Sequence, residues 1–246
     1  MSAGTAVPTS RAYEGGELEL FAGARNWKGY LRDTLRPYLG REVLEVGGGI
    51  GGTTRYLCDG SFDRWLCLEP DGTMAAHLAR RVRNGELPAC CTVRQGVVAD
   101  LPAEPLADTI LYVDVLEHIR DDAEEVAAAA ARLRTGGRLI VLAPAHGWLF
   151  TPFDRAVGHY RRLQARDAQR LTPPGLALER VAYLDSAGLL ASLANRVLLR
   201  SAMPTPRQVR LWDRGLVPVS RLLDRVLSFR VGKSVLMVWK KTGPGP

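Results

Sequence analysis

Short apolar runs alternate with segments of helical spacing along most of this chain. The runs are rich in Val, Leu and Ile and are bounded by polar or glycine residues, which is typical of strands buried in a parallel sheet. Between them, apolar residues recur every three or four positions, which predicts amphipathic helices. The predicted strands cover residues 43–46, 64–69, 107–114, 138–143, 177–184 and 232–240.

The intervening segments complete an alternating order of strands and helices. Acids in the first turn of the segment 121–135 complement a helix dipole, and Gly136-Gly137 predicts where that helix ends. Strands that alternate with helices indicate an α/β fold with a doubly wound sheet, open at the carboxyl ends of its strands. The predicted helices cover residues 18–39, 52–57, 73–83, 121–135 and 166–171.

A glycine-rich turn, residues 47–52, follows the first strand. Glycines let the backbone turn sharply near a ligand, and the helix N-terminus beyond them offers unpaired N–H groups. Gly47, Gly49 and Gly52 have the spacing of a dinucleotide-binding loop. Glu45, two residues before the first glycine, would repel a pyrophosphate at close range. Its carboxylate suits the cationic methionine end of S-adenosylmethionine instead.

Residues 45–51 resemble the first motif of the class I S-adenosylmethionine-dependent methyltransferases, acid-x-Gly-x-Gly-x-Gly. Three further segments resemble family motifs in the same order. Glu69 ends the second strand, where an acid accepts ribose hydroxyls, although NAD enzymes share that feature. Asp100 lies in a segment that resembles the adenine-binding loop, or else it only caps a turn. Asp114 ends a strand beside the expected position of the methionine moiety.

The resemblance is to the ubiquinone/menaquinone-type group of small-molecule methyltransferases. It implies an α/β, Rossmann-like, doubly wound sheet of seven strands with an N-terminal helix and inserted cap segments. It also implies S-adenosylmethionine as the cofactor and S-adenosylhomocysteine as the product. The residues expected to bind the cofactor are Glu45, Gly47, Gly49, Gly51, Glu69, Pro70, Asp100, Leu101, Asp114, Val115 and His118.

We expect one methyltransferase domain over residues 1–246. In this fold, inserted segments lie over the carboxyl ends of the strands, so the insertions and the N-terminal helix should form the acceptor pocket. Trp27 and Tyr30 either close over the cofactor or pack that helix on the sheet. The expected parts are an N-terminal helical segment (1–41), a cofactor-binding core (42–143) and two cap segments (144–163 and 186–229), the second with helices near 189–199 and 217–227.

Candidate catalytic residues lie in the first cap segment. Methyl transfer from a sulfonium is an in-line displacement at carbon, so a protein chiefly aligns the acceptor and needs a base only if the acceptor carries a proton. His146 follows the fifth strand directly, and His159 and Tyr160 form a polar cluster with two arginines that offer forks for an acceptor carboxylate or phosphate. Asp154 could orient His159. The alternative is an ion-paired anchor for the loop.

A metal site is a further alternative, although we expect none. Asp114, Glu117 and His118 resemble an acid-x-x-Glu-His set that binds a divalent cation in some members of the superfamily. His146 or His159 could complete such a site. Relatives without metal carry similar runs, in which the histidine shapes the start of a helix.

Composition agrees with an enzyme of the cytoplasm. The net charge is +7, with arginine far in excess of four lysines, but basic residues are scattered rather than gathered in one arm. Nucleic acid is therefore an unlikely partner. No apolar run approaches the ~18 residues that a membrane span needs, and the first residues lack the pattern of a secretion signal. The four cysteines have no zinc-ligand spacing, and the oligomeric state is not predicted.

The expected function is methylation of an oxygen, nitrogen or carbon atom of a small metabolite, such as a natural-product, lipid or sugar intermediate. An RNA methyltransferase is the main alternative, and it should bind polynucleotides in a salt-dependent way. A non-catalytic protein that binds the cofactor and a partner is another. An NAD-dependent oxidoreductase is less favoured.

Overall fold

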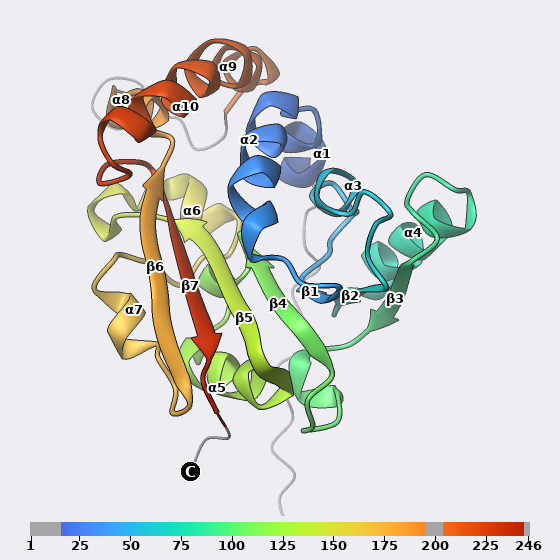
Figure 1. The fold of residues 1–246 in the computed structure, drawn as a ribbon. Helices are drawn as coiled ribbons and strands as arrows, with labels where there is room; N and C mark the ends of the chain where they lie inside the picture. The colour runs from blue at the N-terminus through green and yellow to red at the C-terminus, as the bar shows by residue number, and fades with distance from the viewer. Residues whose placement is uncertain (1–15, 195–203, 244–246) are drawn as a thin grey trace, which may run out of the picture.

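The computed structural model describes residues 16–194 and 204–243. Its seven strands form one sheet in the order β3-β2-β1-β4-β5-β7-β6 (Figure 1). β7 is antiparallel to both of its neighbours, and the other paired strands are parallel. The strands are β1 (Glu42–Val46), β2 (Arg64–Glu69), β3 (Cys91–Gln95), β4 (Ala107–Val113), β5 (Leu133–Pro144), β6 (Leu176–Leu184) and β7 (Ser234–Lys241).

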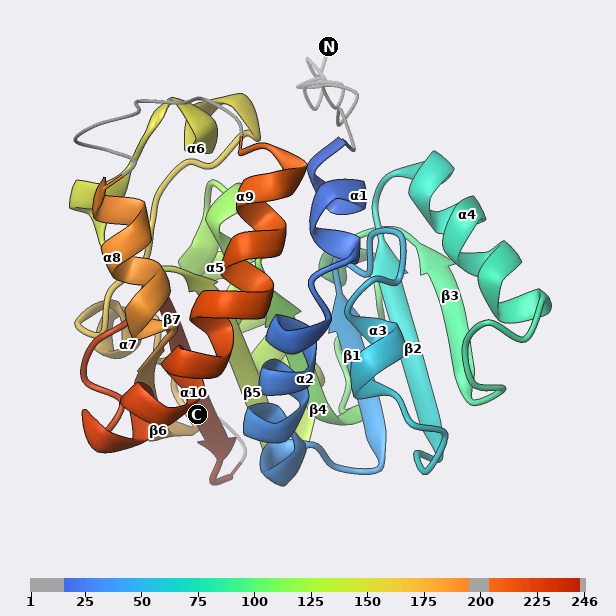
Figure 2. The same cartoon turned by 90° about the horizontal axis from the view of Figure 1, so that it is seen from above.

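Helices cover both faces of the sheet, because successive side chains of its strands point to opposite faces. Val43 packs in a core with α2, α3 and α10, whereas Leu44 packs in a second core with α5 and α7. Figure 2 shows α9 and α10 lying beside α1 and α2 on the first face. The helices are α1 (Gly16–Ala22), α2 (Arg25–Leu35), α3 (Thr54–Leu57), α4 (Gly72–Arg83), α5 (Asp122–Arg132), α6 (Pro152–Ala156), α7 (Asp167–Arg170), α8 (Ser186–Ala194), α9 (Pro206–Leu211) and α10 (Val217–Val226), with a π-helical turn at Trp212–Leu216.

The predicted α/β fold with a doubly wound seven-stranded sheet is confirmed, but one helix boundary is wrong. The helix predicted to reach residue 135 ends at Arg132, and Gly136-Gly137 lies inside β5. Gly136 has φ +81°, and a Cβ on Gly137 would lie 2.7 Å from the carbonyl oxygen of Asp108. These glycines therefore allow the irregular backbone at the start of β5, where the register of β5 against β4 shifts.

The second cap segment also differs from the prediction. α8 begins at Ser186 and α10 at Val217, close to the predicted helices, but residues 195–199 lie outside the described ones. α9 was not predicted. Thr205 begins it as an N-cap, because its hydroxyl accepts from the backbone N–H of Gln208 while the Gln208 side chain accepts from the backbone of Thr205.

Candidate cofactor and acceptor site

A cavity of about 440 Å³ lies at the carboxyl ends of β1, β4 and β5. Its floor is the glycine-rich turn and the ends of these strands. Its walls come from the N-terminal helices, from the first cap segment and from the second. The lining residues include Leu18, Trp27, Lys28, Glu45, Gly47, Gly49, Asp114, Glu117, His118, Phe153, His159, Arg162, Val209, Trp212 and Lys233.

Two glycines of the turn are required by its shape. Gly47 has φ +70°, and a Cβ there would lie 2.5 Å from a methyl carbon of Val115. Gly51 has φ +75°, and a Cβ there would meet Leu78 at 2.5 Å. Both the left-handed backbone and the close packing exclude side chains. Val115, which we expected beside the cofactor, thus holds the turn against the end of β4 and is not among the lining residues.

Glu45 is buried below the turn with polar partners. Its Oε2 accepts hydrogen bonds from the Thr54 hydroxyl at 2.8 Å and from the Trp65 indole N–H at 2.7 Å. Burial raises the pKa of the Glu45 carboxyl, and these two bonds partly offset that rise. The acid therefore fixes α3 against the sheet and also faces the cavity.

Lys28 is a cavity residue that the sequence analysis missed. Its ammonium donates to the Thr53 hydroxyl at 3.2 Å, beside the glycine-rich turn. Burial lowers the pKa of Lys28, and the charges of Asp114 and Glu45 oppose that effect. The chain has only four lysines, and two of them, Lys28 and Lys233, line this cavity. The rarity of lysine in an arginine-rich chain was the available signal.

Asp114 has a strained backbone and an open carboxylate. Its φ is +54°, which is uncommon for a residue other than glycine, and its side chain is exposed to the cavity although protein surrounds it. Burial raises the pKa of Asp114, whereas the charges of Lys28, His159 and Lys233 lower it. The carboxylate is thus ready for a cationic ligand group.

His159 and Asp154 form the hydrogen-bonded pair that the sequence suggested. His159 Nδ1 lies 2.9 Å from Asp154 Oδ1, and its Nε2 lies 3.9 Å from Glu117 Oε1. Burial alone would raise the pKa of Asp154, but hydrogen bonds from His159 and Arg162 hold it well below its ordinary value. An ionised Asp154 accepts the Nδ1 proton, so the Nε2 lone pair of a neutral His159 faces the cavity.

Glu117 and His118 complete this cluster. Both oxygens of Glu117 are buried and have no hydrogen-bond partner among the described residues. Burial together with the charge of Asp114 raises the pKa of Glu117 well above its ordinary value. Burial and the neighbouring His159 lower the pKa of His118 to about 4. The ligand atoms of Glu117, His118 and His159 lie within 4.8 Å of one another, without Asp114 or His146. The expectation of no metal stays a prediction.

The arginines of the first cap segment are already engaged. Arg162 binds both oxygens of Asp154, at 2.8 and 2.9 Å, and Arg161 pairs with Asp122 at 2.6 Å. Arg162 therefore braces the segment internally and Arg161 ties it to α5, which agrees with the alternative of an ion-paired anchor. Arg162 still lines the cavity with its side chain.

Two predicted catalytic residues lie elsewhere. The Tyr160 side chain is 59% exposed and is not among the lining residues. His146 stacks on Tyr183 with ring centres 4.9 Å apart, and its Nε2 lies 2.9 Å from the carbonyl oxygen of Gly232. We therefore drop both as catalytic candidates. The sequence could not show that the cap segment turns these rings away from the cavity.

The residues expected at the ribose and adenine lie beyond the cavity. Glu69 accepts the backbone N–H of Gly49 at 2.8 Å and of Asp71 at 3.0 Å, which leaves one lone pair on each oxygen for ribose hydroxyls. Asp100 accepts the backbone N–H of Val97 at 2.8 Å and so caps a short turn. Six of all the residues expected to bind the cofactor do not line the cavity: Gly51, Glu69, Pro70, Asp100, Leu101 and Val115.

The N-terminal helix both packs on the sheet and lines the cavity. Trp27 is 8% exposed, lines the cavity and lies against Trp212, with ring centres 5.7 Å apart. Tyr30 points elsewhere, because its hydroxyl donates to Asp224 at 2.7 Å. Of the two aromatic residues considered for the cofactor, Trp27 is therefore the one that lines the cavity.

Sequence comparison supports the predicted family over the cofactor-binding core. A family model described as a methyltransferase domain matches residues 44–139, which contain the glycine-rich turn, Glu69, Asp100 and Asp114. These residues match a methyltransferase domain, as the resemblance to the class I S-adenosylmethionine-dependent methyltransferases implies. The predicted family and the predicted cofactor, S-adenosylmethionine, are thereby confirmed.

Two curated proteins are similar to this chain. It is 31% identical over 106 residues to a probable S-adenosylmethionine-dependent methyltransferase of Mycolicibacterium smegmatis, which is 43% of this chain and 38% of that protein. It is 32% identical over 144 residues to an uncharacterized 37.1 kDa protein in transposon TN4556 of Streptomyces fradiae, which is 57% of this chain and 40% of that protein. The matches thus span well under half of each relative.

A solved structure supports the fold over nearly the whole chain. A geranyl diphosphate methyltransferase in complex with S-adenosylmethionine superposes with a TM-score of 0.63 at 16% identity, covering 95% of this chain and 93% of that one. Among the described residues, no helix is both long and apolar enough to cross a membrane.

Proposed function

We propose that this chain transfers the methyl group of S-adenosylmethionine to an oxygen, nitrogen or carbon atom of a small metabolite, a natural-product, lipid or sugar intermediate among them. The observation that carries the proposal is one cavity in which the glycine-rich turn and His159 lie together. The cofactor would supply the electrophilic methyl group, and the protein would align the acceptor.

The cofactor would lie along the carboxyl ends of β1, β2 and β4. Glu69 would accept the ribose hydroxyls, and Asp100 and Leu101 would flank the adenine. The methionine end carries an ammonium and a carboxylate. The ammonium suits Glu45 and the exposed carboxylate of Asp114, whereas Lys28 offers the cation for the methionine carboxylate.

The acceptor would enter between the two cap segments. Phe153, Val209 and Trp212 give the cavity apolar walls from residues 144–163 and 186–229, which we propose as the acceptor pocket of a single domain. Polar side chains also line the cavity, His159 and Glu117 among them. An acceptor with an apolar body and one hydroxyl or amine would fit this distribution.

His159 would take the acceptor proton where there is one. Its Nε2 is not used by Asp154, and Asp154 would stabilise the imidazolium that forms. Glu117, kept neutral by burial, would add a hydrogen bond without a competing charge. We place the reaction in the cytoplasm, since all four cysteines are free thiols.

The test has two stages. Calorimetric titration with S-adenosylmethionine, S-adenosylhomocysteine and NAD should show saturable binding of the first two only. An acceptor screen that detects S-adenosylhomocysteine release then allows His159→Ala to be measured. The variant should lose about 10²- to 10⁴-fold in turnover while its cofactor affinity stays within about twofold. Binding of NAD alone would contradict the proposed cofactor. A His159→Ala variant that loses cofactor affinity and folding stability together with its turnover would contradict the proposed role of His159.

A further inference from the structure

One outer face of the molecule combines exposed apolar side chains with arginines. α9, the π-helical turn and α10 form a continuous helical run from Pro206 to Val226. Apolar residues recur along its solvent side at helical spacing, and their side chains are exposed. They are Leu211, Val219, Leu222 and Val226, with exposed fractions of 69, 48, 66 and 73%.

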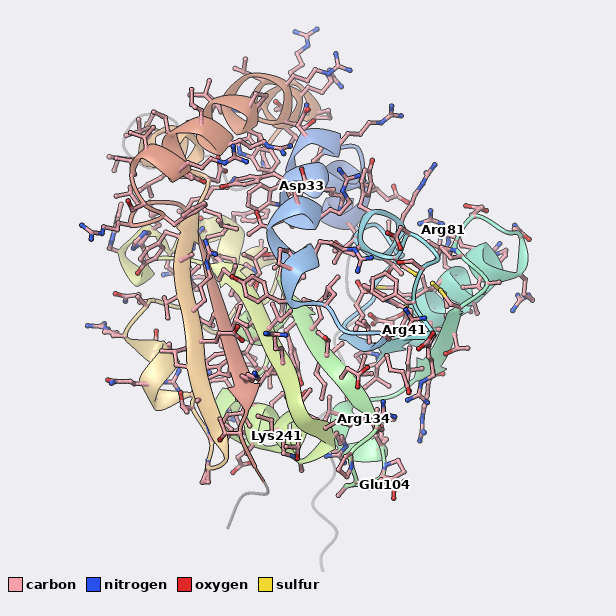
Figure 3. The ribbon with its side chains drawn as sticks, viewed as in Figure 1. Asp33, Arg41, Arg81, Glu104, Arg134 and Lys241 are labelled. Atoms are coloured by element: carbon pink, nitrogen blue, oxygen red, sulfur yellow. The ribbon has the colours of Figure 1, made fainter. Side chains whose placement is uncertain are left out.

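Arginines flank this apolar stripe. Arg221 is partly exposed, and Figure 3 shows long nitrogen-tipped side chains that project outward above α9 and α10. Of the arginines in this run, only Arg221 makes an ion pair within the described part of the chain, with Asp33, which Figure 3 labels. The arginines of the run that are exposed are Arg207, Arg210, Arg214 and Arg225.

The acids of the same run point inward. Asp213 accepts the backbone N–H of Trp27 at 2.9 Å, and Asp224 accepts the Tyr30 hydroxyl and the backbone N–H groups of Asp185 and Ser186. Both carboxylates are buried. The outward side of the run therefore carries positive charge and apolar surface, without a negative group of its own.

We propose that this face, defined by the stripe and the four exposed arginines, docks on an anionic lipid bilayer. A helix with one anchored face, an apolar stripe and flanking cations lies in the interface of such a membrane, where arginines meet lipid phosphates and the stripe enters the acyl boundary. The run is bound along its inner side to α2, so it docks as part of the fold and does not cross the bilayer.

Other occupants fit this face less well. A second copy related by a two-fold axis would bring two rows of arginines together, which like charge opposes. Nucleic acid would match the arginines but not the leucine and valine stripe between them. An anionic membrane satisfies both features, and the docking does not depend on methyl transfer.

Vesicle co-sedimentation of the full chain, without cofactor or acceptor, tests this proposal. Vesicles of phosphatidylcholine with about one third phosphatidylglycerol should retain the protein far better than pure phosphatidylcholine, and added salt should weaken the binding. The double variant Arg210→Gln/Arg225→Gln should bind about 25-fold more weakly, since each arginine near a charged surface contributes roughly fivefold. Leu222→Gln should also weaken binding, because the stripe contributes separately.

The matched control is Arg80→Gln/Arg83→Gln on α4, which removes the same charge from exposed positions away from this face. Its vesicle binding should stay within a few fold of the parent chain, by ordinary long-range electrostatics. Equal binding to both vesicle types, or equal losses in the two double variants, would overturn the proposal. So would light scattering that shows a dimer abolished by Leu222→Gln, or a preference for polynucleotide over anionic vesicles.

Discussion

At the scale of single residues, burial controls the charges of the ionisable groups that line the cavity. His118 lines the cavity beside His159, with ring centres 4.6 Å apart in an edge-on arrangement. Protonating either ring would place a cation next to the other. Burial and the charge of Asp114 raise the pKa of the adjacent Glu117 carboxyl well above its ordinary value. The pH dependence of folding should therefore report on this cluster.

We expect folding stability to fall as the pH drops from about 6.5 to about 4 because of His118. Burial lowers the pKa of this imidazole to about 4 in the folded chain. The unfolded chain binds the proton near its ordinary value of about 6.5, so it binds more protons in this window and unfolding becomes easier as the pH falls. The shift corresponds to about 3 kcal/mol at most.

Denaturant unfolding measured at several pH values checks this expectation. His118→Gln cannot take up a proton, so it should flatten the pH dependence between about 4 and 6.5 while leaving the rest of the curve alone. A curve of unchanged steepness in the variant would assign the loss to other groups. His77 is exposed on α4, and its replacement by Gln is the control that should change nothing.

Individual residues also mark the limit of sequence reasoning. Asp154 and His159 were paired correctly from their types and spacing, because a cap segment with those groups has few other ways to satisfy a buried acid. Tyr160, one position further on, points to solvent, since a local turn decides side-chain direction and leaves no periodic signal. Lys28 was missed because it lies on a helix that ordinary packing alone explains.

At the scale of elements, the glycine-rich turn connects strand geometry to cofactor binding. Gly47→Ala should weaken S-adenosylmethionine binding and lower the free energy of unfolding by about 1–3 kcal/mol. The alanine would have to keep the positive φ of Gly47, and its Cβ would have to displace the Val115 side chain. Calorimetry and denaturant unfolding measure the two effects. Gly52→Ala is the control from the same turn.

At Gly52 a Cβ would meet only the Lys28 ammonium at 3.5 Å, an ordinary contact, and no positive φ is required. That variant should therefore bind the cofactor and unfold nearly as the parent chain does. Equal effects of the two substitutions would mean that the turn tolerates side chains wherever they are placed, and that its shape is not what holds the cofactor.

The elements show why most of the fold was predictable and part was not. Strands that are buried on both faces have continuous apolar sequences, so the predicted bounds of β1, β2 and β4 lie close to the observed ones. β5 began earlier than predicted because Leu133 leaves the helix to pair with β4, and Gly136-Gly137, typical of a helix end, also suits an irregular strand. A pair of glycines cannot tell these two uses apart without the neighbouring strand.

At the scale of the whole molecule, the second cap segment is held to the N-terminal helix by buried acids. Asp213 reaches the start of α2, where its two oxygens accept the backbone N–H groups of Asn26 at 3.3 Å and Trp27 at 2.9 Å. Contacts between residues so far apart in sequence leave no local pattern, so the sequence predicted an acceptor pocket without showing what closes it. Asp213 is thus the point at which two walls of the cavity meet.

Asp213→Ala should therefore lower the free energy of unfolding by about 1–2 kcal/mol, the cost of leaving the N–H groups at a helix start unpaired. It should also weaken S-adenosylhomocysteine binding, because Trp27 and Lys28 lie on the helix that Asp213 caps and both line the cavity. Asp33→Ala is the matched control, since its ion pair with Arg221 is well exposed and contributes little. If the two variants lose the same stability and keep the same affinity in denaturant unfolding and calorimetry, the cap is not what joins the two halves of the cavity.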